Sequence, residues 1–114
     1  MTAANLNFEV EQGATWKHEL QVNSGDSALD LTGFIARMQF RERVESEEAT
    51  INITNGQGIT ITPATGGISL ILSASETGAL TAGSYFYDLE IESSDGEVTR
   101  VIAGTVEVSR QITR

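Results

Sequence analysis

Alternation of apolar and polar side chains with a period of two is the feature that most constrains how this chain can fold. It is clearest in the eight residues that follow a turn at Asp30 to Gly33. The side chains on one face there are Phe34, Ala36, Met38 and Phe40, and those on the other are Ile35, Arg37, Gln39 and Arg41. Successive side chains of a strand point to opposite faces, so this segment predicts a strand with one face on a core and the other nearer to water.

The same alternation recurs along the chain and predicts a series of short strands. They span residues 5–11, 15–22, 34–41, 50–54, 58–62, 68–72, 84–92 and 98–108. A hairpin is expected around Asn55 to Gly58, with the isoleucines of its two strands sharing a core-facing side. A second hairpin is expected at Asp95-Gly96, because both residues tolerate a positive φ.

Local signals modify this pattern at three places. Ser73 and Glu76 have the spacing of a capping box, which predicts one helical turn that ends near Gly83. Gly104 lies inside the last predicted strand and indicates a bulge or the close approach of another backbone. Residues 42–48 are rich in charge, which predicts a solvated loop or an exposed helical turn.

These observations predict an all-β fold. Seven to nine short strands with one short helical turn are typical of an immunoglobulin-like antiparallel β-sandwich, and a jelly roll or a small barrel is the alternative. The chain of 114 residues, 1–114, has the size of a single domain with one modest core.

Composition excludes several classes of function. The net charge of −9 and the pI near 4.4 describe a surface that repels phosphate backbones, so we expect no direct binding to nucleic acid. Without cysteine the chain can form neither a disulfide nor a thiolate metal site. No apolar run is long enough for a membrane span, and the first residues have no secretory signal, so we expect no membrane partner and an intracellular protein when it is made.

The side chains that carry chemistry are few. His18 is the one histidine, and it lies in the middle of a predicted strand with neither a nucleophile motif nor a second ligand, which favours a partly buried structural or interface residue. Asp88, Glu90 and Glu92 form an acidic row on the outer face of one strand, as solvated strands commonly do. We therefore expect no catalytic residues, no cofactor and no metal site, and we interpret the chain as a non-enzyme.

Three residues are candidates for contact with a partner. Arg37 and Arg41 lie on the outer face of their predicted strand, where they pair with the acidic row across the sheet or contact another subunit. Phe86 is predicted to point outward among acidic residues, as an anchor for a partner. A shift of register by one residue would instead place Phe86 in the core.

Several short motifs occur together and in order along the chain. They are Gln12-Gly13-Ala14-Thr15, Asp30-Leu31-Thr32-Gly33-Phe34, Ala36-Arg37-Met38-Gln39, Gly83-Ser84-Tyr85, Tyr87-Asp88-Leu89-Glu90, Gly96-Glu97-Val98-Thr99-Arg100, Gly104-Thr105-Val106 and Ile112-Thr113-Arg114. In this combination the chain resembles a group of small virion-associated proteins of tailed bacteriophages. It is similar, over nearly its whole length, to the N-terminal domain of phage baseplate upper proteins.

The resemblance implies a structural module of the virion, present in multiple symmetric copies, whose partners are other tail, baseplate, fibre or capsid proteins. The chain stops at Arg114 without a following coiled coil or fibre, which favours an adaptor or a decoration protein over a receptor-binding one. Arg110 and Arg114 give a basic segment on an acidic body. We expect residues 1–5 and 110–114 to be the first choice for docking, because such segments are easily ordered by a partner.

Three hypotheses of function remain open at this point. The first is an adaptor at the tail, baseplate or fibre-attachment region, and the second is a capsid decoration protein on the exterior of the shell. The third is a carbohydrate-binding sandwich, in which Trp16, Phe86 or a tyrosine would have to provide the aromatic surface.

Overall fold

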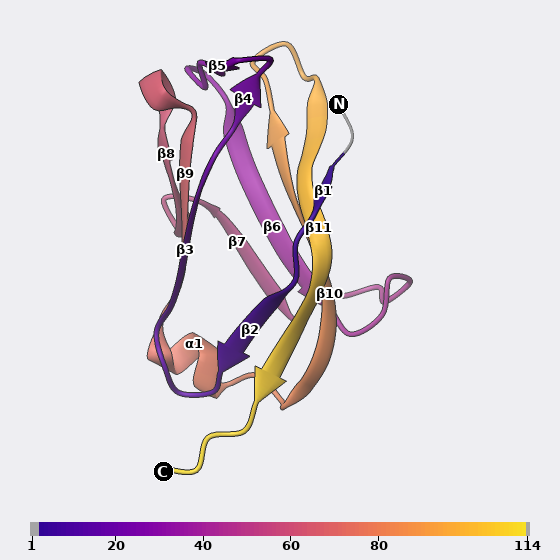
Figure 1. Ribbon diagram of the computed structural model, residues 1–114. Helices are drawn as coiled ribbons and strands as arrows, with labels where there is room; N and C mark the ends of the chain where they lie inside the picture. Colours follow the sequence, from indigo (N-terminus) through magenta and orange to yellow (C-terminus); the bar gives the residue numbers. More distant parts are fainter. Residues whose placement is uncertain (1–2, 114) are drawn as a thin grey trace.

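The computed structural model describes residues 3–113, most of which form β-strands (Figure 1). The strands are β1 (Ala4–Asn5), β2 (Phe8–Glu11), β3 (Trp16–Gln21), β4 (Asn23–Ser24), β5 (Ser27–Ala28), β6 (Ile35–Arg41), β7 (Ile51–Asn55), β8 (Gly58–Thr62), β9 (Gly67–Leu72), β10 (Gly83–Glu92) and β11 (Val98–Ser109). A 3₁₀ turn at Pro63–Thr65 precedes β9, and the helix α1 (Ala74–Gly78) follows it. The prediction of an all-β fold with a short helical turn is confirmed.

The strands form one long sheet that folds over into two layers (Figure 1). In the larger layer β10 is central and pairs antiparallel with both β6 and β11. β7 pairs with the other edge of β6, and β1 and β2 pair with the other edge of β11. In the smaller layer β9 pairs antiparallel with β8 and β3. This order is that of an immunoglobulin-like sandwich. The short strands β4 and β5 form a separate hairpin.

The core lies between the layers and is filled by alternate strand residues. The predicted inward faces of β6 and β10 are confirmed, since Met38, Phe40, Tyr85 and Leu89 are all buried. The Tyr85 hydroxyl donates a hydrogen bond of 2.7 Å to the Thr81 carbonyl just upstream, the arrangement known in sandwich folds as a tyrosine corner. This bond fixes the connection from α1 into β10.

The expected hairpin between residues 50–54 and 58–62 is wrong. β7 and β8 meet only in a short parallel pairing of Thr54 with Gly58 and of Asn55 with Ile59. Thr54 and Gln57 exchange two backbone hydrogen bonds, which turn the chain so tightly that it passes from one layer to the other. Each strand therefore pairs with its own layer. Even so, the isoleucines of both strands still pack on or within the core, as the alternation predicts.

The first strand also differs from its prediction. It is broken at residues 6–7 into β1 and β2, and both pair parallel, not antiparallel, with β11. Leu6, expected on the core-facing side with Phe8 and Val10, is 37% exposed because the break turns it away. Both pieces lie at the edge of the larger layer, beside β11.

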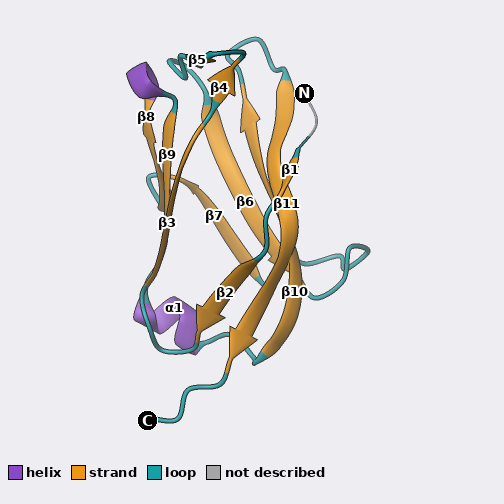
Figure 2. Cartoon of the chain, in the orientation of Figure 1, coloured by secondary structure: helices purple, strands orange, loops and turns teal. Residues whose placement is uncertain are grey.

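Other local predictions are confirmed with small changes. Ser73 and Glu76 form both hydrogen bonds of a capping box at the start of α1. The hairpin after β10 is present, but only Gly96 adopts a positive φ, of 86°, and Asp95 does not. Residues 42–50 form a loop beside the larger layer (Figure 2). Within residues 3–113, no helix has the length and apolar character that crossing a membrane requires.

Candidate functional site

The outer face of the larger layer carries most of the candidate residues, because alternate side chains of β6, β10 and β11 point away from the core. Arg37 joins two carboxylates there: its Nε lies 3.0 Å from Glu90 Oε1 and its Nη1 lies 2.9 Å from Glu92 Oε1. Arg100 Nε lies 3.2 Å from Asp88 Oδ2. The Glu92 and Glu90 carboxylates raise the pKa of Arg37 further above its ordinary value. Pairing of Arg37 with the acidic row across the sheet is confirmed.

Arg41 behaves differently from Arg37. It donates from Nη1 to the Ser46 carbonyl and from Nη2 to Gln39 Oε1, each at 2.7 Å. The ion pairs of the described residues do not include Arg41, so its predicted pairing with the acidic row is wrong. The reason is register: Arg41 lies opposite Phe86, not opposite an acidic residue. Its charge instead anchors the 42–50 loop.

Phe86 points outward, so the register predicted from alternation is correct. Its side chain is 44% exposed, between Arg41 on β6 and Thr105 on β11. An exposed aromatic ring on the middle strand of a sheet provides apolar contact area at a low cost in conformational entropy. Phe86 therefore remains a candidate for contact with a partner or ligand.

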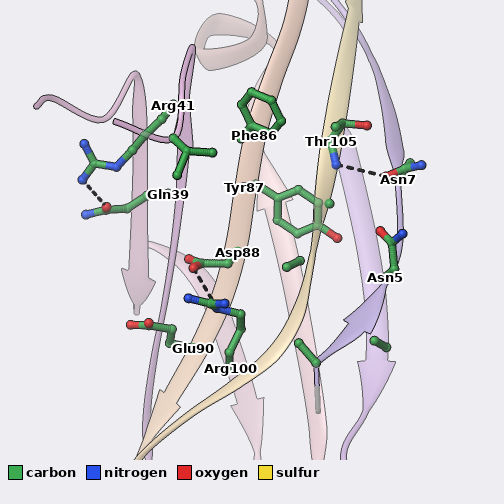
Figure 3. A pocket seen from close by; sticks show the side chains of 15 residues that line it. Asn5, Asn7, Gln39, Arg41, Phe86, Tyr87, Asp88, Glu90, Arg100 and Thr105 are labelled. Carbon is green, nitrogen blue, oxygen red and sulfur yellow. Dashed lines mark hydrogen bonds and ion pairs between the residues drawn. The ribbon is translucent and has the colours of Figure 1, made fainter. Parts of the chain in front are cut away.

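A groove of about 800 Å³ crosses this face beside Phe86 (Figure 3). It is lined by Ala3, Ala4, Asn5, Asn7, Gln39, Arg41, Val44, Phe86, Tyr87, Asp88, Glu90, Arg100, Ala103, Gly104 and Thr105. The hollow forms because β11 presents the small residues Ala103 and Gly104 next to large neighbours. Gln39 and Arg41 border it on one side, and Asn5 and Asn7 of the first strand border it on the other.

The break between β1 and β2 sets this second border. Leu6 crosses directly over Gly104, and three hydrogen bonds hold Leu6 and Asn7 there. Leu6 N donates to the Ala103 carbonyl at 3.0 Å, the Tyr87 hydroxyl donates to the Leu6 carbonyl, and Thr105 N donates to Asn7 Oδ1 at 3.0 Å. Burial raises the pKa of Tyr87 to about 12, because the phenolate would be poorly solvated.

Gly104 confirms one of the two predictions made for it. A Cβ built on Gly104 would lie 2.4 Å from the Leu6 carbonyl oxygen, so the expected close approach of another backbone is present. The bulge lies elsewhere in β11: Leu89 pairs with Ile102 and Glu90 with Arg100, which leaves Val101 as the extra residue. The bulge places Arg100 beside Asp88 and thereby helps to shape the groove.

The lining of the groove is electrically balanced, unlike the molecule as a whole. Arg41 and Arg100 lie there with Asp88 and Glu90, so the formal charge of the lining is zero, whereas the whole chain carries −9. Beyond the groove the same outer face is acidic, because it also carries Glu9, Glu11 and Glu107. An uncharged ligand in the groove therefore meets no net local charge, whereas an anion is repelled by the surrounding carboxylates.

His18 lies away from this face, half-buried among aromatic rings of the core edge. Its ring centroid is 4.7 Å from that of Phe8 and 6.4 Å from that of Trp16. The expectation of a partly buried histidine is confirmed. In the part of the chain that the structure describes, no group of three histidine or acidic side chains is arranged to hold a metal ion.

The basic segment after β11 lies apart from the groove. Arg110 is exposed and directly follows β11. It comes five residues after Thr105 of the groove, which is about 17 Å of extended chain. Gln111 N donates to Gln12 Oε1 at 2.9 Å, and the Gln111 side chain lies against Gly13, which fastens the segment to the turn before β3. Arg114, the other predicted docking residue, lies outside the described residues. The structure thus brings Arg37, Arg41 and Phe86 together and leaves Arg110 separate.

Sequence reasoning did not identify Asn7, Arg100 and Thr105 as residues of the groove. Asn5, which falls in the predicted docking segment 1–5, and Asn7 reach the groove because the first strand runs parallel along β11, which the alternation does not encode. Gly104 was the one signal that another backbone lies there. In comparisons with other proteins, no family model matches this chain, and no curated protein matches it.

Proposed function

We propose that this chain is a non-enzymatic structural protein of a tailed-bacteriophage virion, an adaptor that docks larger components at the tail, baseplate or fibre-attachment region. The order of short motifs along the sequence supports this proposal. The structural observation that carries it is the segment after β11, where the exposed Arg110 and the 91% exposed Ile112 run out from an acidic body (Figure 1).

This segment has the properties of a docking element. Gln111 fixes where it leaves the body, so its neighbours Arg110 and Ile112 project in a defined place. An exposed isoleucine next to a positive charge can insert into an apolar site with an acidic rim on a partner. Because virion components are repeated by symmetry, a weak contact of this kind gains strength through many simultaneous copies.

Shortening the segment tests the docking role. We expect a variant that lacks residues 112–114 to be incorporated into particles about tenfold less than the wild type, because it loses the apolar contact but keeps the Gln111 tether. Ile71→Asp is the matched control, since Ile71 is exposed on the outer side of β9 in the other layer. Equal incorporation of the shortened variant and the wild type would contradict docking through this segment.

Copy number separates the adaptor from the decoration protein. The measurement is the amount of this chain relative to the major capsid protein in purified particles, by quantitative mass spectrometry. About six or twelve copies would support an adaptor on the tail axis, whereas hundreds would support a decoration protein on the shell. Absence of the chain from purified particles would contradict both.

A further inference from the structure

The groove beside Phe86 combines three features that are independent of docking through the segment after β11. It is open to solvent, the charges of its lining cancel although the molecule is acidic, and its walls are held by internal bonds. Arg100 and Asp88 hold each other, Gln39 holds Arg41, and Asn7 binds the backbone of Thr105 (Figure 3). A ligand would therefore meet side chains that are already positioned, which lowers the entropy cost of binding.

The polar side chains of the groove are mostly planar amide, carboxylate and guanidinium groups. Each internal bond uses one hydrogen-bonding atom of a side chain that has a second such atom. The Asn7–Thr105 bond uses Asn7 Oδ1 and leaves Nδ2, and the Arg100–Asp88 pair uses one carboxylate oxygen and leaves the other. Asn5 adds a further amide at the border. Such groups can donate to one hydroxyl and accept from its neighbour, as adjacent hydroxyls of a sugar ring require.

Phe86 supplies the apolar part of the site. Its exposed ring lines the groove, which the small residues Ala103 and Gly104 also line. The C–H face of a pyranose ring packs on an exposed aromatic ring. Phe86 and Asp88 are two residues apart on one face of β10, which places them about 7 Å from each other. That spacing fits stacking of one sugar ring on Phe86 and hydrogen bonding of the same ring or the next by Asp88.

Other classes of ligand fit less well. The groove lies mainly over β10 and β11, whose backbone groups already pair on both sides within the sheet, so a peptide laid there could not add a strand. Phosphate-rich and other polyanionic ligands would meet Asp88 and Glu90 in the lining and the carboxylates of Glu9, Glu11 and Glu107 farther along the same face. From these observations we infer that the groove binds a neutral oligosaccharide.

The test is a titration of the full 114-residue chain with neutral oligosaccharides, followed by amide shifts in ¹⁵N-labelled protein. The probes are hexasaccharides of glucose, xylose, mannose and N-acetylglucosamine. We expect at least one to bind with a Kd on the order of 1 mM or tighter, as an open groove allows. The shifted amides should be those of the groove lining. No binding by any probe at ~10 mM would overturn the inference.

Variants show whether the binding uses the groove. Phe86→Ala should weaken it about tenfold, Phe86→Tyr should retain it, and Asp88→Ala should weaken it several-fold. Ile71→Ala, on the opposite face, should leave the Kd unchanged, with thermal unfolding showing that each variant is folded. Binding that survives in both Phe86→Ala and Asp88→Ala, or that occurs only with anionic saccharides, would overturn the inference.

The two proposals fail separately. Phe86→Ala should lose sugar binding without any loss of incorporation into particles, and deletion of residues 112–114 should do the reverse. If Phe86→Ala instead abolishes incorporation while every sugar probe fails to bind, the face is a protein interface and the saccharide inference is wrong.

Discussion

The carbonyl oxygen of Leu6 lies so close to Gly104 that a Cβ at position 104 would stand 2.4 Å from it. The same carbonyl accepts the hydrogen bond from the buried Tyr87 hydroxyl. The crossing of the first strand over β11, and with it one border of the groove, therefore depends on the absence of a side chain at residue 104.

Gly104→Ala should destabilise the protein by about 2 kcal/mol, because the added methyl group must displace Leu6 from its hydrogen bonds. Urea unfolding measures this loss. In a variant that lacks residues 2–7 the clash is gone, and alanine suits a strand better than glycine, so the same substitution should be neutral or slightly stabilising. An equal loss in both backgrounds would show that the crossing does not account for Gly104.

Tyr87 should make the protein less stable at alkaline pH. Its pKa is raised from 10.0 to about 12 in the folded protein. The unfolded chain therefore releases this proton first, so stability is fully present below about pH 10 and is lost as the pH rises toward 12. Few other groups titrate in this window, because the chain has two tyrosines, one lysine and no cysteine.

The measurement for Tyr87 is Tm against pH. Tyr87→Phe should be less stable at pH 7, because it loses the bond to Leu6, and its Tm should fall less between pH 10 and 12 than that of the wild type. The pKa of Tyr85 is also raised by burial, so part of the decline should remain. A decline of the same size in Tyr87→Phe would contradict the assignment.

The paired arginine Arg37 should contribute to stability in a salt-dependent way. Arg37→Met removes two ion pairs that are about one-third exposed, so we expect a loss of about 1 kcal/mol at low salt. The loss should shrink in ~1 M NaCl, where the Debye length is about 3 Å. Arg43→Met, at an exposed loop position, is the matched control and should change stability by less than about 0.5 kcal/mol. A loss of the same size at both salt concentrations would point to packing of the Arg37 stem instead.

The sequence predicts what depends on neighbours along the chain and misses what depends on the arrangement of strands. Alternation identified the buried faces of β6 and β10 and the outward direction of Phe86, because burial on one side of a strand imposes a period of two. It could not show that β7 and β8 join different layers, since the turn at Gln57 looks like that of a hairpin. Alternation also gives the face of a residue without its cross-strand neighbour. It therefore placed both Arg37 and Arg41 beside the acidic row, although only Arg37 lies opposite an acidic residue.

The side chain of Gln12 connects three segments that the sequence does not link. Its Nε2 donates to the Leu80 carbonyl at 2.7 Å, and its Oε1 accepts from Gln111 N at 2.9 Å. Gln12→Ala leaves both partly buried backbone groups without these bonds, so we expect a loss of about 2 kcal/mol in urea unfolding.

Truncations separate this structural role of the tether from docking. Deletion of residues 111–114 removes the Gln111 bond and the contact of the Gln111 side chain with Gly13, and should cost about 1 kcal/mol. Deletion of residues 112–114 keeps that bond and should cost almost nothing, because Ile112 is exposed. A large loss of stability in the shorter deletion would mean that Ile112 belongs to the fold, and reduced incorporation of that variant would then no longer indicate a docking contact.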